Sequence, residues 1–452
     1  MSQTERSVLS CDFKCEDADD FQRIALFIGQ DTTDYGPVFT AGVFSMPHRD
    51  GGGKEEMMTV TKELANNQAL LSHALCFDPV YQQQAPGGDF RLHFREFENV
   101  PGIRILEDGS VEVTFYAPGA KTVQIQGLGG SFEGTYDMFP LEEMPGYWRT
   151  VLKGLMSGFH YHWYLVDGVK TFHPTIPFGY GCSCVMNYFE LPDPDFTDYL
   201  LKDVPHGSLH MELYHSGVTG RERNCWVYTP PGYMDEPEKR YPVFYLQHGG
   251  GENETGWIWQ GKVNYILDNL IAQDKCREMI LVMNCGYNFQ DRGDGKFVLE
   301  DIPDVICKDC VPMIDKRYRT IPQKEYRAVA GLSFGSVHAR MTAFGNTDVF
   351  SSLGIFSGGF DYKTTGARGE GNLGVYDYSW LFESPDVFRE HIKLLFIGMG
   401  TCETEMIQGC RDRIEALKQA GFDLDCHVYE GYHEWKVWRK CAYDMAQKLF
   451  RW

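Results

Sequence analysis

The sequence lacks the features that mark membrane, exported and nucleic-acid-binding proteins. Among its 452 residues, no run approaches the roughly 18 unbroken apolar residues of a membrane-spanning helix. The N-terminus, MSQTERSVLSCDFKCEDADD, has neither the basic start nor the apolar stretch of a secretory signal. Basic residues are few, since 42 Lys and Arg stand against 63 Asp and Glu and give a net charge of −21. We therefore expect no nucleic-acid or membrane partner, and a cytoplasmic location unless a secretory signal has been trimmed.

Two further absences narrow the class of protein. The 48 Gly and 21 Pro show no Gly-X-Y period, which excludes a collagen-like fibre. The 14 Cys are scattered rather than gathered in a small disulfide framework, so we expect mostly buried free thiols. Cys307 and Cys310 form one C-x-x-C, but no second ligand pair stands at zinc-finger spacing. We interpret this pair as structural and expect neither a metal nor a cofactor.

The length predicts two or three domains, and the composition changes along the chain in agreement. Residues 1–88 contain strand-like and helix-like runs but no recognisable chemistry. Residues 89–190 read as short strands separated by Gly, Pro and Asp-Gly turns, with Val111, Val113 and Phe115 on one face of an alternating run. This spacing predicts an immunoglobulin-like β-sandwich. The segment that follows, ELPDPDFTDYLLKDVPHG, reads as an extended linker.

From residue 207 to 452, apolar strand-like runs alternate with helical patterns. This alternation predicts a largely parallel sheet with helices on both faces, an α/β architecture whose chemistry gathers at the carboxyl ends of the strands. The expected strands are PVFYLQ, MILVMN, RAVAG, LGIFSG, KLLFIGMG and CHVYEG, and the expected helices include VNYILDNLIAQ, DVICKDCVPMIDKRY and ETEMIQGCRDRIEALKQAG.

The sharpest chemical signal is AVAGLSFGSVHAR, in which residues 331–335 fit the pattern G-x-S-x-G between a strand and a helix. Small residues are needed at both ends because the turn is tight and strained. Ser333 would then project from the top of the sheet as a nucleophile. Upstream, Gly249, Gly250 and Gly251 directly follow a predicted strand. Their N–H groups, with that of Phe334, would form an oxyanion hole, although a flexible glycine turn is the alternative.

A serine nucleophile needs a base and an acid that follow it in the order serine, acid, histidine. His433 lies in YEGYHEWKVWRK, between the last predicted strand and the last helix. Glu403 follows the strand KLLFIGMG in a loop, and we expect it to orient His433. Glu405 sits at the expected helix start, where it would complement the helix dipole. Asp423 and Asp425 are the other candidates.

Aromatic residues near the expected mouth of the site suggest a ring-binding pocket. Stacking suits a phenolic acyl group or sugar rings. Because aromatics make up 14% of the chain, core packing is the alternative at each position. The candidate substrate-binding residues are Trp257, Trp259, Tyr287 and Trp435.

Four of these stretches together resemble carbohydrate esterase family 1, the feruloyl and acetylxylan esterases related to esterase D and enterochelin esterase. They are YLQHGGGENETGWIWQGKVNYILDNLI, AGLSFGSVHA, LLFIGMGTCETE and GYHEWKVWRKCA. The resemblance implies an α/β-hydrolase fold with the nucleophile on Ser333 and the base on His433. It departs from the family in one place, since Glu403 stands where the family usually has Asp. The segments VEVTFYAPGAKTVQI and HYHWYLVDGVKTFHPTIPFGYG resemble early-set modules of carbohydrate-binding family 48.

The resemblance implies a serine carboxylesterase that releases ferulic acid from esterified plant cell-wall saccharides, with a possible homodimer. Deacetylation of xylan-type oligosaccharides and hydrolysis of an enterochelin-type siderophore are alternatives within the same chemistry. A glycan-binding protein with an inactive hydrolase domain is the alternative outside it. The β-rich module would either bind glycan or pack against the catalytic domain, and we favour packing.

Overall fold

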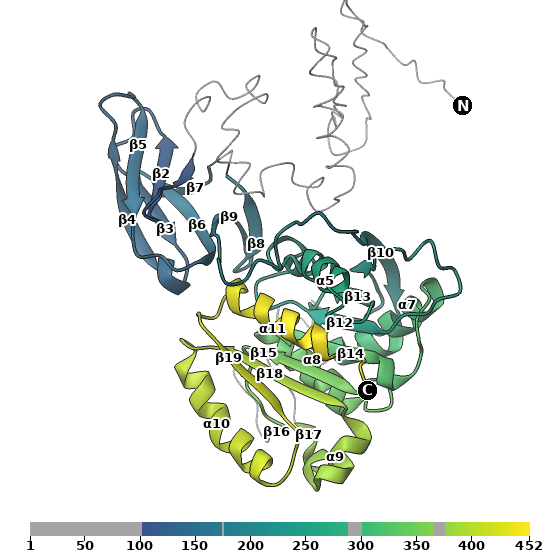
Figure 1. The fold of residues 1–452 in the computed structure, drawn as a ribbon. Helices are drawn as coiled ribbons and strands as arrows, with labels where there is room; N and C mark the ends of the chain where they lie inside the picture. The colour runs from purple at the N-terminus through teal and green to yellow at the C-terminus, as the bar shows by residue number, and fades with distance from the viewer. Residues whose placement is uncertain (1–101, 174–175, 288–300, 365–375) are drawn as a thin grey trace, which may run out of the picture. The chain divides into compact units, whose positions relative to one another are not determined.

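The computed structural model describes residues 102–173, 176–287, 301–364 and 376–452 (Figure 1). Every described residue belongs to one compact unit, which lies within Asn66–Trp452. The interpretations of residues 1–88 therefore lie outside the described residues. None of the described helices combines the length and the apolar character that a membrane-spanning helix requires.

The first part of the described chain is an antiparallel β-domain, as the sequence predicts. Its strands follow the spatial order β1-β2-β5-β4-β3-β6-β9-β8, with β7 paired to β6. Strand β4 pairs with β3 along most of its length and with β5 at its end, so it joins the two halves of the domain. The strands are β1 (Ile103–Ile105), β2 (Val111–Tyr116), β3 (Val123–Gly127), β4 (Gly134–Pro140), β5 (Tyr147–Leu152), β6 (Gly158–Val166), β7 (Val169–Thr171), β8 (Phe178–Gly181) and β9 (Cys184–Leu191).

Alternation along β2 builds the core of this domain. Val111, Val113 and Phe115 are all buried, which confirms that they share one face, and they pack in the same cluster as Val123 and Ile125 of β3. Side chains of period two put every second residue on the core side of a strand. The sequence did not predict β1, β4, β8 or β9. Strand β4 is mostly exposed and β9 mostly buried, so neither alternates, and β1 and β8 are only 3 and 4 residues long.

The second part of the chain holds a mixed, mostly parallel sheet of eight strands with helices, again as predicted. The order is β10-β11-β13-β12-β14-β15-β18-β19, and the pairs from β13-β12 to β18-β19 are parallel. The antiparallel hairpin at one edge was not expected from the sequence. The strands are β10 (Ser208–Ser216), β11 (Arg221–Thr229), β12 (Val243–Gln247), β13 (Ile280–Asn284), β14 (Arg327–Leu332), β15 (Ser352–Phe356), β18 (Leu394–Gly400) and β19 (Asp425–Tyr429), with a small separate pair β16 (Lys363–Thr364) and β17 (Tyr376–Asp377).

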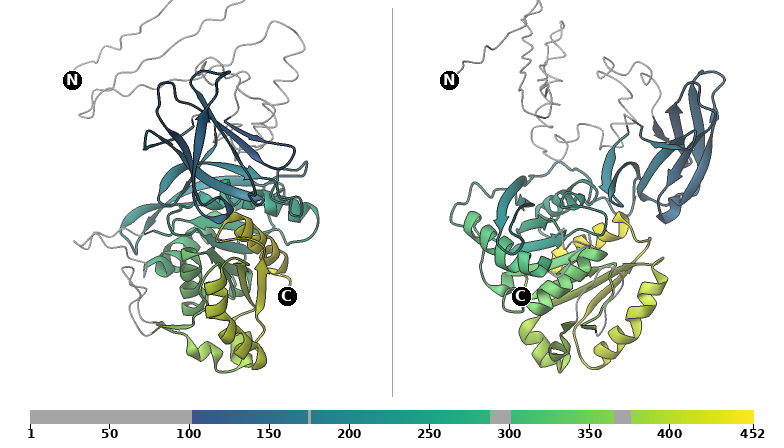
Figure 2. Two further views of the ribbon diagram at one scale, coloured as in Figure 1. Left: turned by 90° about the vertical axis from the view of Figure 1, so that its left-hand side faces the viewer. Right: turned by 180° about the vertical axis from the view of Figure 1, so that it is seen from behind.

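Helices cover both faces of this sheet, as Figures 1 and 2 show from three sides. Helices α5 and α11 share one apolar cluster with Phe244 and Leu246 of β12, whereas α7, α8, α9 and α10 share the opposite cluster with Val243 and Tyr245. The expected helix over 304–318 contains a π-helical turn, Val305–Cys310. The helices are α4 (Gly256–Trp259), α5 (Val263–Ala272), α6 (Asp301–Asp304), α7 (Val311–Arg317), α8 (Phe334–Gly345), α9 (Pro385–His391), α10 (Thr404–Gln419) and α11 (Trp435–Lys448).

A buried ion network ties the β-domain to the sheet domain. Glu190 of β9 lies between Arg439 of α11 and Lys262, and all three side chains are largely buried. Burial alone would raise the pKa of Glu190, but the two cations outweigh it and lower the pKa to about 2. Arg439 also donates to the carbonyl oxygen of Gln260. The segment read as a linker packs too, since Phe196 and Tyr199 are buried within it.

Candidate active site

Ser333 sits at the turn from β14 into α8, in the strained geometry that the motif predicts. Its backbone angles are φ 50° and ψ −116°, which L-residues with a side chain rarely adopt. A side chain on Gly331 would collide with the backbone of Gly335, and one on Gly335 would collide with the carbonyl oxygens of Gln247 and His248. Glycine is therefore required on both sides of the serine, which explains the spacing of the motif.

The structure brings His433 and Glu403 together, although thirty residues separate them in the chain. His433 follows β19, and its Nδ1 lies 2.5 Å from Oε1 of Glu403. The Glu403 side chain is 5% exposed and the His433 side chain 44% exposed, so the acid is buried behind a ring that faces solvent. The edge of that ring meets Trp438 at 5.1 Å between centroids. Among the described residues, no hydrogen bond joins the hydroxyl of Ser333 to His433.

Two further donors fix the other oxygen of Glu403. Ser357 at the end of β15 donates its hydroxyl at 2.7 Å, and the Gly400 N–H donates at 2.5 Å, both to Oε2. The sequence reading did not include Ser357, although its position at the carboxyl end of the strand beside β18 is the signal that would have found it. Both carboxylate oxygens of Glu403 are thus engaged, with Oε1 left to His433.

The other acidic candidates lie away from His433. Glu405 is exposed in the first turn of α10, the position at which we expected it to complement the helix dipole. Asp423 is exposed, and Asp425 pairs with His427 and Lys448.

The glycine loop after β12 lies beside Ser333. A side chain on Gly249 would reach within 3.5 Å of Ser333 Cβ, and one on Gly250 within 3.6 Å of Phe334 Cβ. Two of the loop N–H groups already have acceptors, because Gly249 donates to Glu252 Oε2 at 3.1 Å and Gly251 donates to the Tyr287 hydroxyl. Among the described residues the Gly250 N–H has no recorded acceptor. It is therefore the loop group best placed to serve a substrate carbonyl.

Three side chains, of which His248 and Glu252 are buried, hold this loop in place. His248 donates from Nδ1 to the Gly249 carbonyl oxygen at 2.9 Å, while its Nε2 accepts the Gly286 N–H at 2.8 Å. Burial lowers the pKa of His248 to about 4, so the ring is neutral and its tautomer is fixed. The Tyr287 hydroxyl reaches the Gly249 carbonyl at 3.3 Å. Glu252 is 5% exposed, and burial raises the pKa of its carboxyl to about 8.

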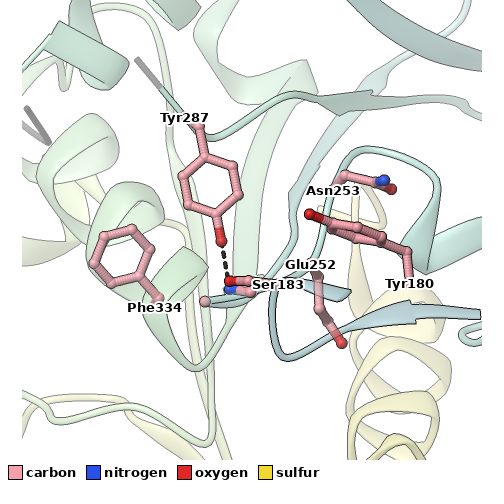
Figure 3. Close-up of a pocket in the computed structure, with 8 residues that line it drawn as sticks. Tyr180, Ser183, Glu252, Asn253, Tyr287 and Phe334 are labelled. Atoms are coloured by element: carbon pink, nitrogen blue, oxygen red, sulfur yellow. Dashed lines mark hydrogen bonds between the residues drawn. The ribbon is translucent and has the colours of Figure 1, made fainter. Parts of the chain in front are cut away.

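A cavity of about 500 Å³ opens beside this loop (Figure 3). One wall is the loop itself and another is Phe334, the residue after Ser333. A third wall comes from the β-domain, where Tyr180 of β8 and Ser183 of the turn between β8 and β9 line the cavity. This turn is fastened to the loop by the Ser183 N–H, which donates to the Gly251 carbonyl at 2.8 Å. The lining residues are Tyr180, Ser183, Gly250, Gly251, Glu252, Asn253, Tyr287 and Phe334.

Of the four aromatic candidates for substrate binding, Tyr287 lines the cavity and the three tryptophans do not. Trp257 and Trp435 are 0% and 1% exposed and meet edge to face at 5.2 Å between centroids. The Trp257 indole donates to the carbonyl oxygen of Gln247, just before the glycine loop. Trp259 is partly buried against Trp226. These contacts give the tryptophans the packing role that was the alternative to substrate binding.

Four residues that line the cavity were not predicted from the sequence. Glu252 and Asn253 directly follow the glycine run, so proximity was an available signal, but the burial of Glu252 is a property of the fold. Tyr180 and Ser183 lie on the β-domain, and nothing in their local sequence connects them with Ser333. Cys307 and Cys310 are free thiols, and the described part of the chain holds no cluster of three metal-ligating side chains.

Comparisons with known proteins show which family the chain resembles. A family model described as "Putative esterase" matches residues 216–449. An endo-1,4-beta-xylanase/feruloyl esterase of Xylanibacter ruminicola is 34% identical over 390 residues, which cover 83% of this chain and 49% of that protein. The endo-1,4-beta-xylanase Y of Acetivibrio thermocellus is 30% identical over 157 residues, which cover 32% of this chain and 14% of that protein. The chain thus spans at most about half the length of these two relatives.

The fold also has a solved counterpart that includes the β-domain. The enterobactin esterase of Shigella flexneri superposes with a TM-score of 0.55, and the match covers 77% of this chain and 96% of that one. The sequence identity is 16%, so the likeness concerns the fold.

Proposed function

Because the chain belongs to the esterase family, and is thus a carboxylic ester hydrolase, we propose that it is a serine esterase that releases ferulic acid and related hydroxycinnamic acids from esterified plant cell-wall saccharides. One observation carries this proposal. The elbow serine lies beside a cavity with aromatic and hydroxyl groups in its walls, within reach of a loop of N–H donors. The similarity to the xylanase/feruloyl esterase supports the choice of substrate.

The proposed reaction proceeds through an acyl-enzyme on Ser333. The serine hydroxyl attacks the ester carbonyl carbon while His433 Nε2 accepts its proton. The oxyanion that forms is stabilised by the N–H groups of Gly250 and Phe334, the second at the N-terminus of α8, an effect of about 3–4 kcal/mol for a well-placed donor. As the tetrahedral intermediate collapses and its bond to the sugar oxygen breaks, His433 passes the proton to that oxygen, which leaves as a hydroxyl. Water repeats the sequence on the acyl-enzyme, which releases the carboxylic acid and restores Ser333.

The position of Glu403 explains how His433 is prepared for this role. Its Oε1 accepts the Nδ1 proton of His433, which leaves Nε2 unprotonated and able to receive the serine proton. Glu403 itself cannot turn away, because Ser357 and Gly400 hold its second oxygen. Hydrogen bonds between a catalytic serine and its base are often long before substrate binds. We therefore expect the contact between Ser333 and His433 to form in the complex.

The cavity walls favour a neutral aromatic ester over a ferric siderophore. Tyr180, Tyr287 and Phe334 offer ring surfaces, and Ser183 and Asn253 offer polar groups for hydroxyls. No Lys or Arg is among the eight lining residues, and the one ionisable acid there is Glu252. A strongly anionic ligand would meet no counter-charge in these walls. Uncharged feruloyl saccharides fit this lining without such a cost.

The proposal is tested by comparing kcat/KM on methyl ferulate, a feruloylated arabino-oligosaccharide, p-nitrophenyl acetate, acetylated xylan and a catecholate ester. We expect the feruloyl esters to be the best substrates. Ser333→Ala, with its fold checked by circular dichroism, should lose at least about 10³-fold in kcat on each substrate that the protein hydrolyses. A preference for acetyl or catecholate esters would replace the proposed substrate class. Unchanged turnover by folded Ser333→Ala would remove the proposed nucleophile.

A further inference from the structure

We propose that Glu252 is a positioning residue of the oxyanion loop that must be uncharged for the esterase reaction to proceed. The inference rests on the proposed function, since it concerns the same oxyanion. Glu252 takes no part in the proton transfers of the proposed reaction, but it orients the loop whose N–H group stabilises the oxyanion. In this scheme the carboxyl group of Glu252 shapes the loop as a neutral acceptor, and its ionisation switches the reaction off.

The hydrogen bond of Glu252 determines which loop N–H group faces the substrate. Its Oε2 accepts the Gly249 N–H at 3.1 Å, while Tyr287 takes the N–H of Gly251. With its two neighbours engaged in this way, the Gly250 N–H is the loop group left at the cavity, opposite Phe334. A loop without Glu252 would lose one of the two anchors that set this orientation.

Glu252 and Ser333, on which the proposed oxyanion forms, both approach Gly249. The position that a side chain on Gly249 would occupy lies 3.3 Å from Glu252 Oε2 and 3.5 Å from Ser333 Cβ. Leu332 fills that position, and the carboxyl of Glu252 and the side chain of Ser333 both lie close to it. A carboxylate at that distance, screened from water by its burial, would repel the tetrahedral oxyanion that the loop has to stabilise. A neutral carboxylic acid keeps the hydrogen bond without that repulsion.

The surroundings of Glu252 favour the neutral acid. Among the described residues no Lys, Arg or His forms an ion pair with it. The titratable groups that face it from neighbouring elements are Tyr161 of β6, Cys182 of the β8–β9 turn and Tyr287, none of them a cation. Trp435 of α11 lies nearby, because a side chain on Gly256 would come within 3.4 Å of the Trp435 indole and within 3.7 Å of Glu252 Oε2. Burial without a counter-charge raises the pKa of Glu252 to about 8.

The ionisation of Glu252 should make kcat fall as the pH rises. Below pH 8 Glu252 is mostly protonated and the loop is competent. As the pH rises through 8 the carboxylate forms, and kcat should fall by about tenfold between pH 7 and pH 9 if the ionised form is inactive. Loss of a general base cannot explain this fall, because a general base becomes more available as the pH rises.

The experiment is the pH profile of kcat on methyl ferulate from pH 6 to pH 10 for the wild type and three variants. Glu252→Gln keeps an acceptor for Gly249 but cannot ionise, so its kcat should stay within about threefold from pH 7 to pH 9. Glu252→Met removes both the acceptor and the charge, so it should lose the alkaline limb and also about tenfold in kcat at pH 7. Glu254→Gln is the matched control in the same loop, because Glu254 accepts from Asn224 and does not line the cavity. It should keep the wild-type profile.

Each outcome supports or overturns the inference. An alkaline limb near pH 8 in the wild type and in Glu254→Gln, absent from Glu252→Gln, supports it. The same limb in Glu252→Gln overturns it, as does a wild type with no limb below pH 9. If Glu252→Gln fails to fold, Glu252→Met and the wild type still decide between these results. A wild type without esterase activity on any ester of the panel would instead refute the proposed function, which keeps the two failures distinct.

Discussion

Replacing Glu403 with Gln should prevent His433 from acting as a general base while leaving the fold intact, because the substitution changes the hydrogen bond between the two residues. In the wild type, Oε2 receives the Ser357 hydroxyl and the Gly400 N–H, and Oε1 receives His433 Nδ1–H. A glutamine can satisfy two donors only with its carbonyl oxygen, so this oxygen must take the Oε2 position. Its amide N–H₂ then points at His433 Nδ1. The ring responds by keeping Nδ1 unprotonated and carrying its proton on Nε2, where it can no longer accept the serine proton.

The expected loss is large because the wrong tautomer removes general-base catalysis altogether. We expect kcat to fall by about 10³–10⁴-fold, equivalent to about 4–5.5 kcal/mol of transition-state stabilisation, with KM changed far less. The assay is steady-state hydrolysis of methyl ferulate at neutral pH, with thermal unfolding as a check on the fold. Glu405→Gln is the matched control and should keep wild-type kcat, since its side chain is exposed on α10. Glu403→Gln within tenfold of the wild type, or a dead Glu405→Gln, would refute this reasoning.

Two other substitutions probe the supports of the site. Tyr287→Phe removes the acceptor for the Gly251 N–H and should lower kcat about tenfold on both methyl ferulate and p-nitrophenyl acetate. A rise confined to KM for the ferulate would show that the Tyr287 hydroxyl binds the substrate instead. Glu190→Gln breaks the buried network with Arg439 and Lys262 and should destabilise the protein by about 3 kcal/mol at pH 7. Because the pKa of Glu190 is lowered to about 2, the wild-type advantage is present above pH 4.5 and is lost as the pH falls toward 2. Thermal unfolding at pH 7 and pH 3 measures it, and an equal deficit at both pH values would contradict the ionic explanation.

Local patterns in the sequence predicted the fold class and the parts of the site that are local in sequence. The alternation of Val111, Val113 and Phe115 fixed one face of β2, and the strand–turn–helix context of residues 331–335 placed Ser333 in a strained elbow. In both cases a short stretch dictates its own geometry through side-chain period or glycine spacing. The position of Glu403 in the loop before α10 could be predicted for the same reason, since it depends on where one strand ends.

Burial was the property that local patterns did not supply. Trp257 and Trp435 follow the glycine loop and the base in sequence, but their side chains turn into the core and meet each other there. Glu252 illustrates the converse, because a charged residue in a glycine-rich loop reads as exposed, and only the packing around it shows a buried acid. The pattern of hydrophobic residues predicts well which helix or strand a residue belongs to. It predicts poorly whether a side chain next to a loop points into the core or into a cavity.

The most distant part of the site was hidden for a topological reason. Tyr180 and Ser183 reach the cavity because β8 and β9 pair across a turn that lies against Gly251, more than sixty residues further along the chain. A side chain on Gly251, whose φ is +77°, would strike Cys182 and Ser183 at 2.8 Å, so the glycine serves the contact between domains as well as the loop. Gly251, the third glycine of the run, is therefore required by the close contact with the β-domain, and its N–H is not the donor that we assign to the oxyanion. The sequence suggested three equivalent N–H donors, but the fold gives each glycine a different role. Gly249 donates to Glu252, Gly250 lies at the cavity, and Gly251 contacts the turn between β8 and β9.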